Sequence, residues 1–175
     1  MEEQEATYDM KTMKRVLKEA RKVMEKGWCQ EYEAISGESW DWCYNENSNE
    51  YSPDYTPDFW PCSARDHKAR HWCLTGALDL AVYRNCDPTE ERYNLYFYGA
   101  LEILFDTIPP CEKETVCSVY YQLGYIDHDV LHVKPKVGMN IVVTGWNDMP
   151  GRTKEEVVAL VRKAENSLDE RPVAA

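Results

Sequence analysis

Apolar side chains recur at three- and four-residue intervals from Tyr8 to Lys26, and most positions between them hold Lys, Arg or Glu. This spacing places the apolar side chains on one face of an α-helix. Gly27 follows the last periodic residue, where a left-handed C-terminal cap is expected, and Trp28 can pack back on the last turn. We therefore predict an amphipathic helix that ends at Gly27.

Two further helices are predicted in the middle of the chain. The first is expected to begin near Ser63, with Asp66 as the acidic partner of its cap, and to continue through Val82. The second begins after residues 87–90, which supply an Asp cap, a first-turn proline and a capping-box glutamate, and it ends at the prolines 109–110.

The pattern after residue 110 is more varied. A short helix is predicted over residues 112–123, followed by an irregular connection over 126–136. Residues 139–143 are apolar and β-branched enough for one extended segment, and residues 145–151 are a run of turn formers.

The last helix should open at Thr153, with Glu156 as its capping-box partner, and residues 166–175 are expected to form a flexible tail. The predicted fold is therefore mainly α: a single-domain bundle of about five helices, covering residues 1–175, with one short extended segment.

Residues 31–62 lack any helical or strand periodicity and are predicted to form an insertion loop, here called the acidic-aromatic segment. Between residues 31 and 60 there are eight acidic residues, eight aromatic residues and no Lys or Arg. The other 145 residues contain 23 acidic and 20 basic residues, so most of the charge imbalance is in this segment. The segment is either a functional insertion or is held against the domain by its aromatic rings.

Composition narrows the function classes. The net charge of −11 disfavours direct binding to nucleic acid or to anionic membranes, because both are bound mainly through Lys and Arg. A basic protein is the expected partner. No apolar stretch is long enough to cross a bilayer, the first residues do not have the pattern of a signal peptide, and the seven cysteines are an odd number. We expect a cytoplasmic protein with reduced thiols.

Two sets of residues could carry catalysis or bind a metal. Cys29, His71 and Asn147 occur in the chain order of a papain-like nucleophile, base and orienting amide, but Cys29 follows a helix C-terminus, which disfavours a thiolate. Zinc is the second candidate, because four residues of suitable type fall close together: Cys62, His67, His71 and Cys73. Packed thiols and histidines without a ligand role are the alternative in both cases. We expect no catalytic residues and no cofactor or metal.

Three motifs are more specific together than any one alone: GWCQ at residues 27–30, WCLxGA at 72–77 and WNDxPGRTxxEV at 146–157. They resemble an uncharacterised family of small proteins encoded by bacteria, notably actinobacteria, and by their phages. The resemblance implies a common helical fold and a phage origin, but no activity. The chain departs from the family pattern at Glu31, where glycine is usual, and in the greater length of the acidic-aromatic segment.

Two functions follow as hypotheses. The first is a non-enzymatic binding protein that engages a host protein, such as a nucleic-acid-binding or defence component, through the acidic-aromatic segment. The second is a small-molecule or nucleotide-binding protein, or an enzyme, that uses a tryptophan-lined pocket. The candidate binding residues are Trp28, Gln30, Trp72, Trp146, Asn147, Asp148 and Arg152 for the pocket, and Trp40, Asp41, Trp42 and Tyr44 for the segment.

Overall fold

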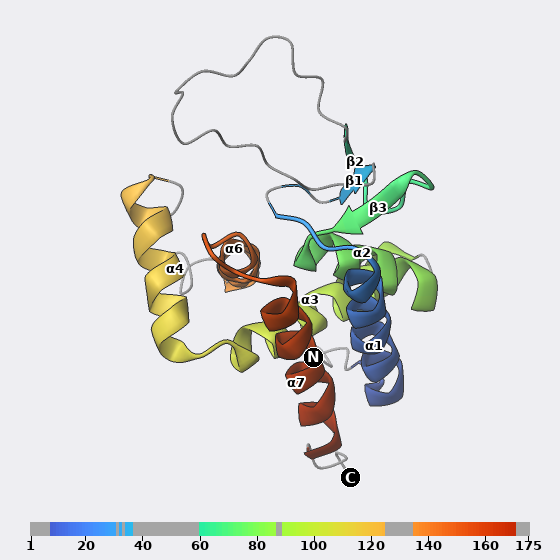
Figure 1. Ribbon diagram of the computed structural model, residues 1–175. Helices are drawn as coiled ribbons and strands as arrows, with labels where there is room; N and C mark the ends of the chain where they lie inside the picture. The colour runs from blue at the N-terminus through green and yellow to red at the C-terminus, as the bar shows by residue number, and fades with distance from the viewer. Residues whose placement is uncertain are drawn as a thin grey trace.

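The computed structural model describes residues 8–30, 32, 34–36, 60–86, 89–124 and 135–170 (Figure 1). This part of the chain is mainly helical, as predicted. In chain order the elements are α1 (Met10–Lys26), β1 (Ala34–Ser36), β2 (Trp60–Cys62), β3 (Ala69–Trp72), α2 (Leu74–Asn85), α3 (Glu90–Thr107), α4 (Pro110–Gln122), α6 (Pro135–Asn147) and α7 (Lys154–Glu170).

The first helix and the start of the last helix confirm their sequence signals, except that Gly27 after α1 is extended, with φ −163°, and does not form the predicted left-handed cap. Asp9 caps α1 by accepting a hydrogen bond from the Thr12 amide at 2.8 Å, and the apolar stripe of α1 is buried against α2 and α7. At the start of α7, the Thr153 amide donates to Glu156 at 2.8 Å and the Glu156 amide donates to Thr153 Oγ1 at 3.3 Å, which completes the capping box. Because α7 continues to Glu170, the first half of the expected tail is helical.

The prediction of a helix starting at Ser63 is wrong. Residues 63–68 form turns, in which the Asp66 amide donates to the Ser63 carbonyl at 2.9 Å, and the chain then enters β3 at Ala69. β1 lies between β2 and β3 and pairs antiparallel with both, in the order β2-β1-β3. Pairing with a distant segment therefore outweighs the local cap signal. The helix α2 begins only at Leu74. Cys73 is its N-cap, and Cys73 Sγ accepts a hydrogen bond from the Gly76 amide at 3.3 Å.

The prediction of an extended segment at residues 139–143 is also wrong. These residues lie inside α6, where Val142 and Val143 are buried and the helix packs on α2, α3 and α4. Burial against three helices outweighs the strand preference of β-branched side chains. The predicted turn over 145–151 is shortened, because α6 runs to Asn147 and the turn that follows ends at Gly151, whose φ is 81°.

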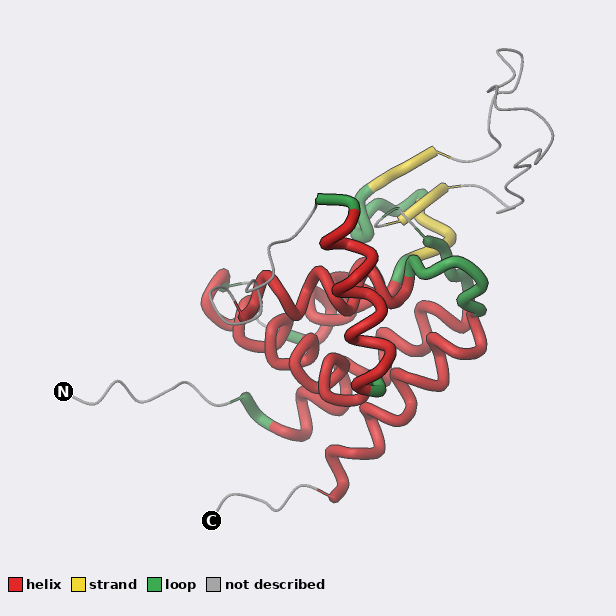
Figure 2. Tube along the Cα trace, turned by 90° about the vertical axis from the view of Figure 1, so that its left-hand side faces the viewer, coloured by secondary structure: helices red, strands yellow, loops and turns green. Residues whose placement is uncertain are grey.

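The proline pair 109–110 separates α3 from α4, as expected, and Gly124 follows α4 with a left-handed φ of 74°. The expected cap residues 87–88 and most of the irregular connection lie outside the described residues. The large side chains at the centre of the core come from α1, α2 and α3: Met13, Leu17, Met24, Leu74, Leu78, Leu101, Ile103 and Leu104. The small sheet lies at one end of this helical body (Figure 2).

Candidate functional site

The three motifs meet at Asn147, which is fully buried at the end of α6. Its Oδ1 accepts a hydrogen bond from Trp28 Nε1 at 2.8 Å, and its Nδ2 donates to the Cys29 carbonyl at 3.4 Å and to Asp148 Oδ1 at 2.7 Å. A backbone hydrogen bond connects Trp72 of the second motif to this group, because its carbonyl accepts from the Cys29 amide at 3.1 Å. The Asn147 side chain thus joins the first and third motifs, and the backbone bond between Cys29 and Trp72 adds the second.

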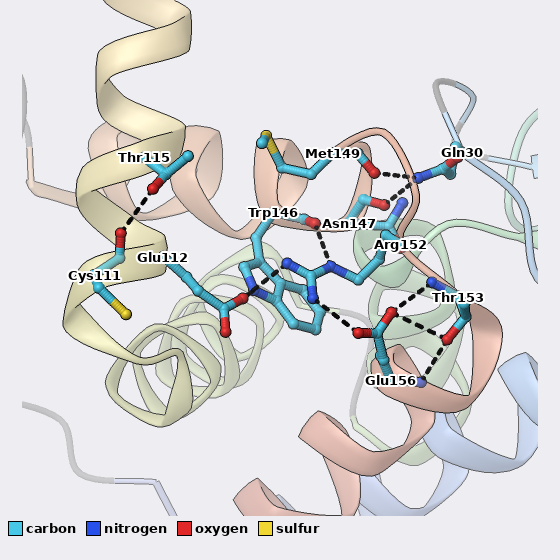
Figure 3. A network of polar contacts seen from close by, with 10 residues as sticks. All are labelled: Gln30, Cys111, Glu112, Thr115, Trp146, Asn147, Met149, Arg152, Thr153 and Glu156. Atoms are coloured by element: carbon cyan, nitrogen blue, oxygen red, sulfur yellow. Dashed lines mark hydrogen bonds and ion pairs between the residues drawn. The ribbon is translucent and has the colours of Figure 1, made fainter.

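Gln30 holds the turn that follows α6 (Figure 3). Its Nε2 donates to the carbonyl oxygens of Asn147 at 2.7 Å and Met149 at 3.2 Å. The side-chain amide of Gln30 therefore satisfies carbonyl groups at the C-terminal end of α6, which have no partner within a helix.

A second cluster surrounds Arg152, whose side chain is 15% exposed. The guanidinium lies 3.9 Å from the centroid of the Trp146 ring, and Nη2 donates to Glu112 Oε2 at 2.8 Å (Figure 3). Trp146 Nε1 donates to the same Glu112 oxygen at 2.5 Å, and Glu156 lies 3.6 Å from Arg152 Nη1. Two carboxylates, those of Glu112 and Glu156, therefore already balance the charge of Arg152.

The predicted pocket residues are therefore brought together mainly by hydrogen bonds to one another and to the main chain. The indole N–H groups of Trp28 and Trp146 donate to Asn147 and Glu112, and that of Trp72 donates to the Ala64 carbonyl at 2.9 Å. This geometry joins the sheet, α4, α6 and α7 to one another. The other four candidate residues, Trp40, Asp41, Trp42 and Tyr44, lie outside the described residues.

The papain-like arrangement is not assembled. Cys29 is fully buried, its Sγ donates to the Tyr32 carbonyl at 3.5 Å, and burial, together with nearby Cys73, raises the pKa of its thiol. The amide of Asn147 is bonded to the groups described above rather than to His71. Burial, and then the charge of Lys154, lowers the pKa of His71. A protonated, enclosed thiol is a poor nucleophile.

The four candidate zinc ligands are also separated. In the described part of the chain, no three His, Cys, Asp or Glu side chains are grouped so that they could hold a metal ion. The physical reason is the missing helix at residues 63–72, which would have placed His67 and His71 one turn apart. His67 instead lies in a turn with its side chain 87% exposed, and Cys73 faces the first turn of α2.

A pocket that the sequence analysis missed lies between α2, α3 and α6. It has a volume of about 230 Å³ and is more open to solvent than enclosed. Among the described residues, each helix supplies two that are spaced four apart and therefore share a face of that helix. The pairs are Thr75 and Asp79 from α2, Tyr93 and Phe97 from α3, and Asn140 and Thr144 from α6.

Charge at this pocket is balanced by Arg65. The Arg65 guanidinium donates to both oxygens of Asp79, at 2.8 and 2.5 Å, and the Tyr93 hydroxyl donates to Asp79 Oδ1. Burial, and then the hydrogen bond to Asp79, raises the pKa of Tyr93, which keeps it a neutral donor. Unlike the polar atoms of Asp79 and Tyr93, Asn140 Oδ1 is buried and has no hydrogen-bond partner.

A protein-family model matches residues 9–167, from the cap of α1 into the last turn of α7, and its description is "Family of unknown function (DUF6197)". The chain belongs to the DUF6197 family. No curated protein and no solved structure matches the chain. The match covers all three motifs and all six pocket residues, so both the Asn147 network and the pocket lie within the DUF6197 domain.

The four-residue spacing of the pocket residues is visible in the sequence of this DUF6197 chain, but it indicates a shared face only if the helices are assigned correctly. Asn140 and Thr144 share a face only if residues 139–143 are helical, and the sequence analysis expected an extended segment there. Among the described residues, no helix is long and apolar enough to span a membrane.

Proposed function

We propose that this chain is a non-enzymatic binding protein that captures a basic partner protein through its acidic-aromatic segment. The observation that supports this most directly is the pairing of Ser36 with Trp60, which flank residues 37–59 of the segment. Antiparallel strands β1 and β2 therefore fix both ends side by side on the sheet. Residues 37–59, between these ends, contain six acidic and six aromatic residues and no Lys or Arg.

Charge and aromatic content have separate roles in this proposal. The carboxylates attract a basic surface over a distance of about one Debye length, roughly 8 Å at physiological salt. Aromatic rings supply the area that anchors most protein interfaces. The rest of the chain is nearly balanced in charge, so the attraction is directed to one segment rather than spread over the molecule.

The tryptophan-lined pocket is the weaker alternative. Its indole N–H groups, Gln30 and Arg152 are hydrogen-bonded within the protein, so a ligand there would have to displace internal partners. We further propose that the protein is encoded by a bacterium or its phage, acts in the cytoplasm, and engages a nucleic-acid-binding or defence component of the host. The three motifs support the origin, and the acidic segment supports a partner that is itself basic.

The test is affinity capture from bacterial lysate at two salt concentrations, followed by titration of the captured protein. One variant neutralises acidic residues in the segment: Glu38→Gln, Asp41→Asn, Glu46→Gln, Glu50→Gln and Asp54→Asn. A matched control removes the same number of exposed charges from the helices: Glu90→Gln, Glu91→Gln, Glu102→Gln, Glu114→Gln and Glu155→Gln.

We expect the first variant to bind at least tenfold more weakly and with a smaller salt dependence, while the control binds as the unmodified protein does. Equal weakening in both variants would mean that only net charge matters. A partner retained in full by the first variant, or no partner at all, would refute the proposal. A third variant, with residues 38–58 replaced by a short neutral linker, should fold because the β1 and β2 ends are adjacent.

A further inference from the structure

We propose that the exposed face of α1 binds the acidic-aromatic segment of a second copy of this chain. This interface rests on the proposed function, in which the segment binds basic protein surfaces. It adds that the chain carries such a surface itself, so that copies associate with one another.

The helix α1 is the basic part of an acidic chain. Its 17 residues include seven Lys or Arg and two Glu, whereas the whole chain has a net charge of −11. Five of these cations are exposed on the face opposite the buried apolar stripe and are here called the basic stripe: Lys11, Arg15, Lys18, Lys22 and Lys26. Their spacing of three or four residues places them in one row along the helix, about 22 Å long.

The carboxylates of α1 do not neutralise this row. Glu19 is paired with Arg84 of α2 at 3.1 Å, and Glu25 with Arg21 of α1 at 2.7 Å. The two remaining cations of the helix, Lys14 and Arg21, pair with carboxylates of α7. None of the five residues of the basic stripe is in an ion pair with a residue that the structure describes. The row is therefore available to carboxylates from outside.

The acidic-aromatic segment has the complementary charge. Residues 37–59 contain no Lys or Arg, and their acidic residues recur every three to five positions: Glu38, Asp41, Glu46, Glu50, Asp54 and Asp58. Exposed ion pairs are individually weak, so a stable contact needs several of them together with an apolar anchor. The segment supplies both, because six aromatic residues lie among these acids.

The position of the sheet favours the segment of another copy over the chain's own. The end of α1 is joined to β3, where the Trp72 amide donates to the Gly27 carbonyl at 3.1 Å. The strands β1 and β2, which flank residues 37–59, lie on the other side of β3 (Figure 1). The segment therefore starts from the side of the sheet away from the basic stripe of its own copy.

Charge also favours a second copy over a nucleic acid. A phosphate backbone on the basic stripe would leave the acidic segment unpaired, whereas contact between stripe and segment neutralises both. Repulsion between two acidic copies is limited, because charges more than about 8 Å apart are largely screened at physiological salt. The local contact therefore decides the balance.

The test follows self-association of the full chain by sedimentation velocity, over about a hundredfold range of protein concentration and at low and high salt. A stripe variant carries Lys11→Glu, Lys18→Glu and Lys22→Glu. Its control carries Lys68→Glu, Lys136→Glu and Lys163→Glu, which make the same change in net charge at exposed positions outside α1. We expect association of the unmodified protein and the control, and about tenfold weaker association of the stripe variant and at high salt.

A mixing experiment shows whether the contact forms between copies. The stripe variant keeps its segment, and the variant with five neutralised acids in the segment keeps its stripe. Each should be monomeric alone, but a mixture of the two should associate, because one stripe and one segment are then intact. No association in the mixture, equal association of the stripe variant and its control, or a monomeric unmodified protein would overturn the proposal. Binding of a labelled single-stranded oligonucleotide to the stripe of a monomeric protein would assign this face to nucleic acid instead.

Capture from lysate separates this inference from the proposed function. The stripe variant retains its segment, so it should capture the basic partner at least as well as the unmodified protein does. A captured partner together with a monomeric protein would overturn only the interface between copies. Association between copies without any captured partner would support this interface and refute the proposed function.

Discussion

Gly27→Ala tests why glycine follows α1. The backbone at Gly27 is extended, with φ −163°, so conformation alone does not require glycine. A methyl group there would instead lie 2.1 Å from the Arg70 carbonyl oxygen and 2.9 Å from the His71 ring. To reach a normal carbon–oxygen contact, β3 would have to move by about 1 Å.

The cost of this movement can be estimated from the bonds it strains. Trp72 lies opposite the junction, where its amide donates to the Gly27 carbonyl and its carbonyl accepts from the Cys29 amide, both at 3.1 Å. Weakening two backbone hydrogen bonds and overpacking the junction should together lower the free energy of unfolding by about 3 kcal/mol. For a domain of this size, that lowers the melting temperature by about 6–12 °C.

The assay is thermal and urea denaturation followed by circular dichroism, with Gly124→Ala as the matched control. Gly124 has φ 74° and no atom near its missing methyl group, so alanine there costs only the left-handed strain of about 1–2 kcal/mol. A Gly27→Ala variant no less stable than Gly124→Ala would refute the argument from close approach.

Three further predictions use the same denaturation assays or chemical modification. Asn147→Leu leaves an indole N–H and a backbone carbonyl without their partner, so it should lower the free energy of unfolding by about 3 kcal/mol, and a loss below about 1 kcal/mol would contradict the network. Hydrogen bonds from Thr153 hold the pKa of Glu156 below its usual range, so this carboxylate stabilises the fold above its usual pKa and loses that effect as pH falls through the lowered value. The stability difference between the unmodified protein and Glu156→Gln should therefore shrink in acid; a constant difference would exclude this titration. Iodoacetamide should modify exposed Cys111 well before Cys29, whose pKa is raised by burial, and mass mapping that shows equal rates would contradict the burial.

Local signals in the sequence predicted the elements that depend on local interactions. The periodicity of residues 8–26 and the Thr153–Glu156 capping box were sufficient for α1 and for the start of α7. β3 could not be predicted in this way, because it exists through pairing with β1 more than 30 residues earlier in the chain. The helix α6 was missed for a related reason, since burial on three sides overrides the strand preference of its valines.

The candidate site shows the same division. Trp28, Gln30 and Asn147, which belong to separate motifs in the sequence, do meet in the structure. The sequence did not show that their polar atoms would bond to one another, because that depends on contacts across more than 100 residues. The pocket was missed because two of its six residues lie on α6, whose helical state the sequence did not reveal.

The packing of α1 against α7 affects how the chain folds during synthesis. Residues 10–26 leave the ribosome well before residues 154–170, and at about 5–20 residues per second the interval is about 7–29 seconds. In that time the apolar stripe of α1 can be covered by α2 but not by α7. The nascent chain therefore exposes an amphipathic helix for seconds, so the yield of folded protein should depend on chaperones that shield this helix from other unfinished chains.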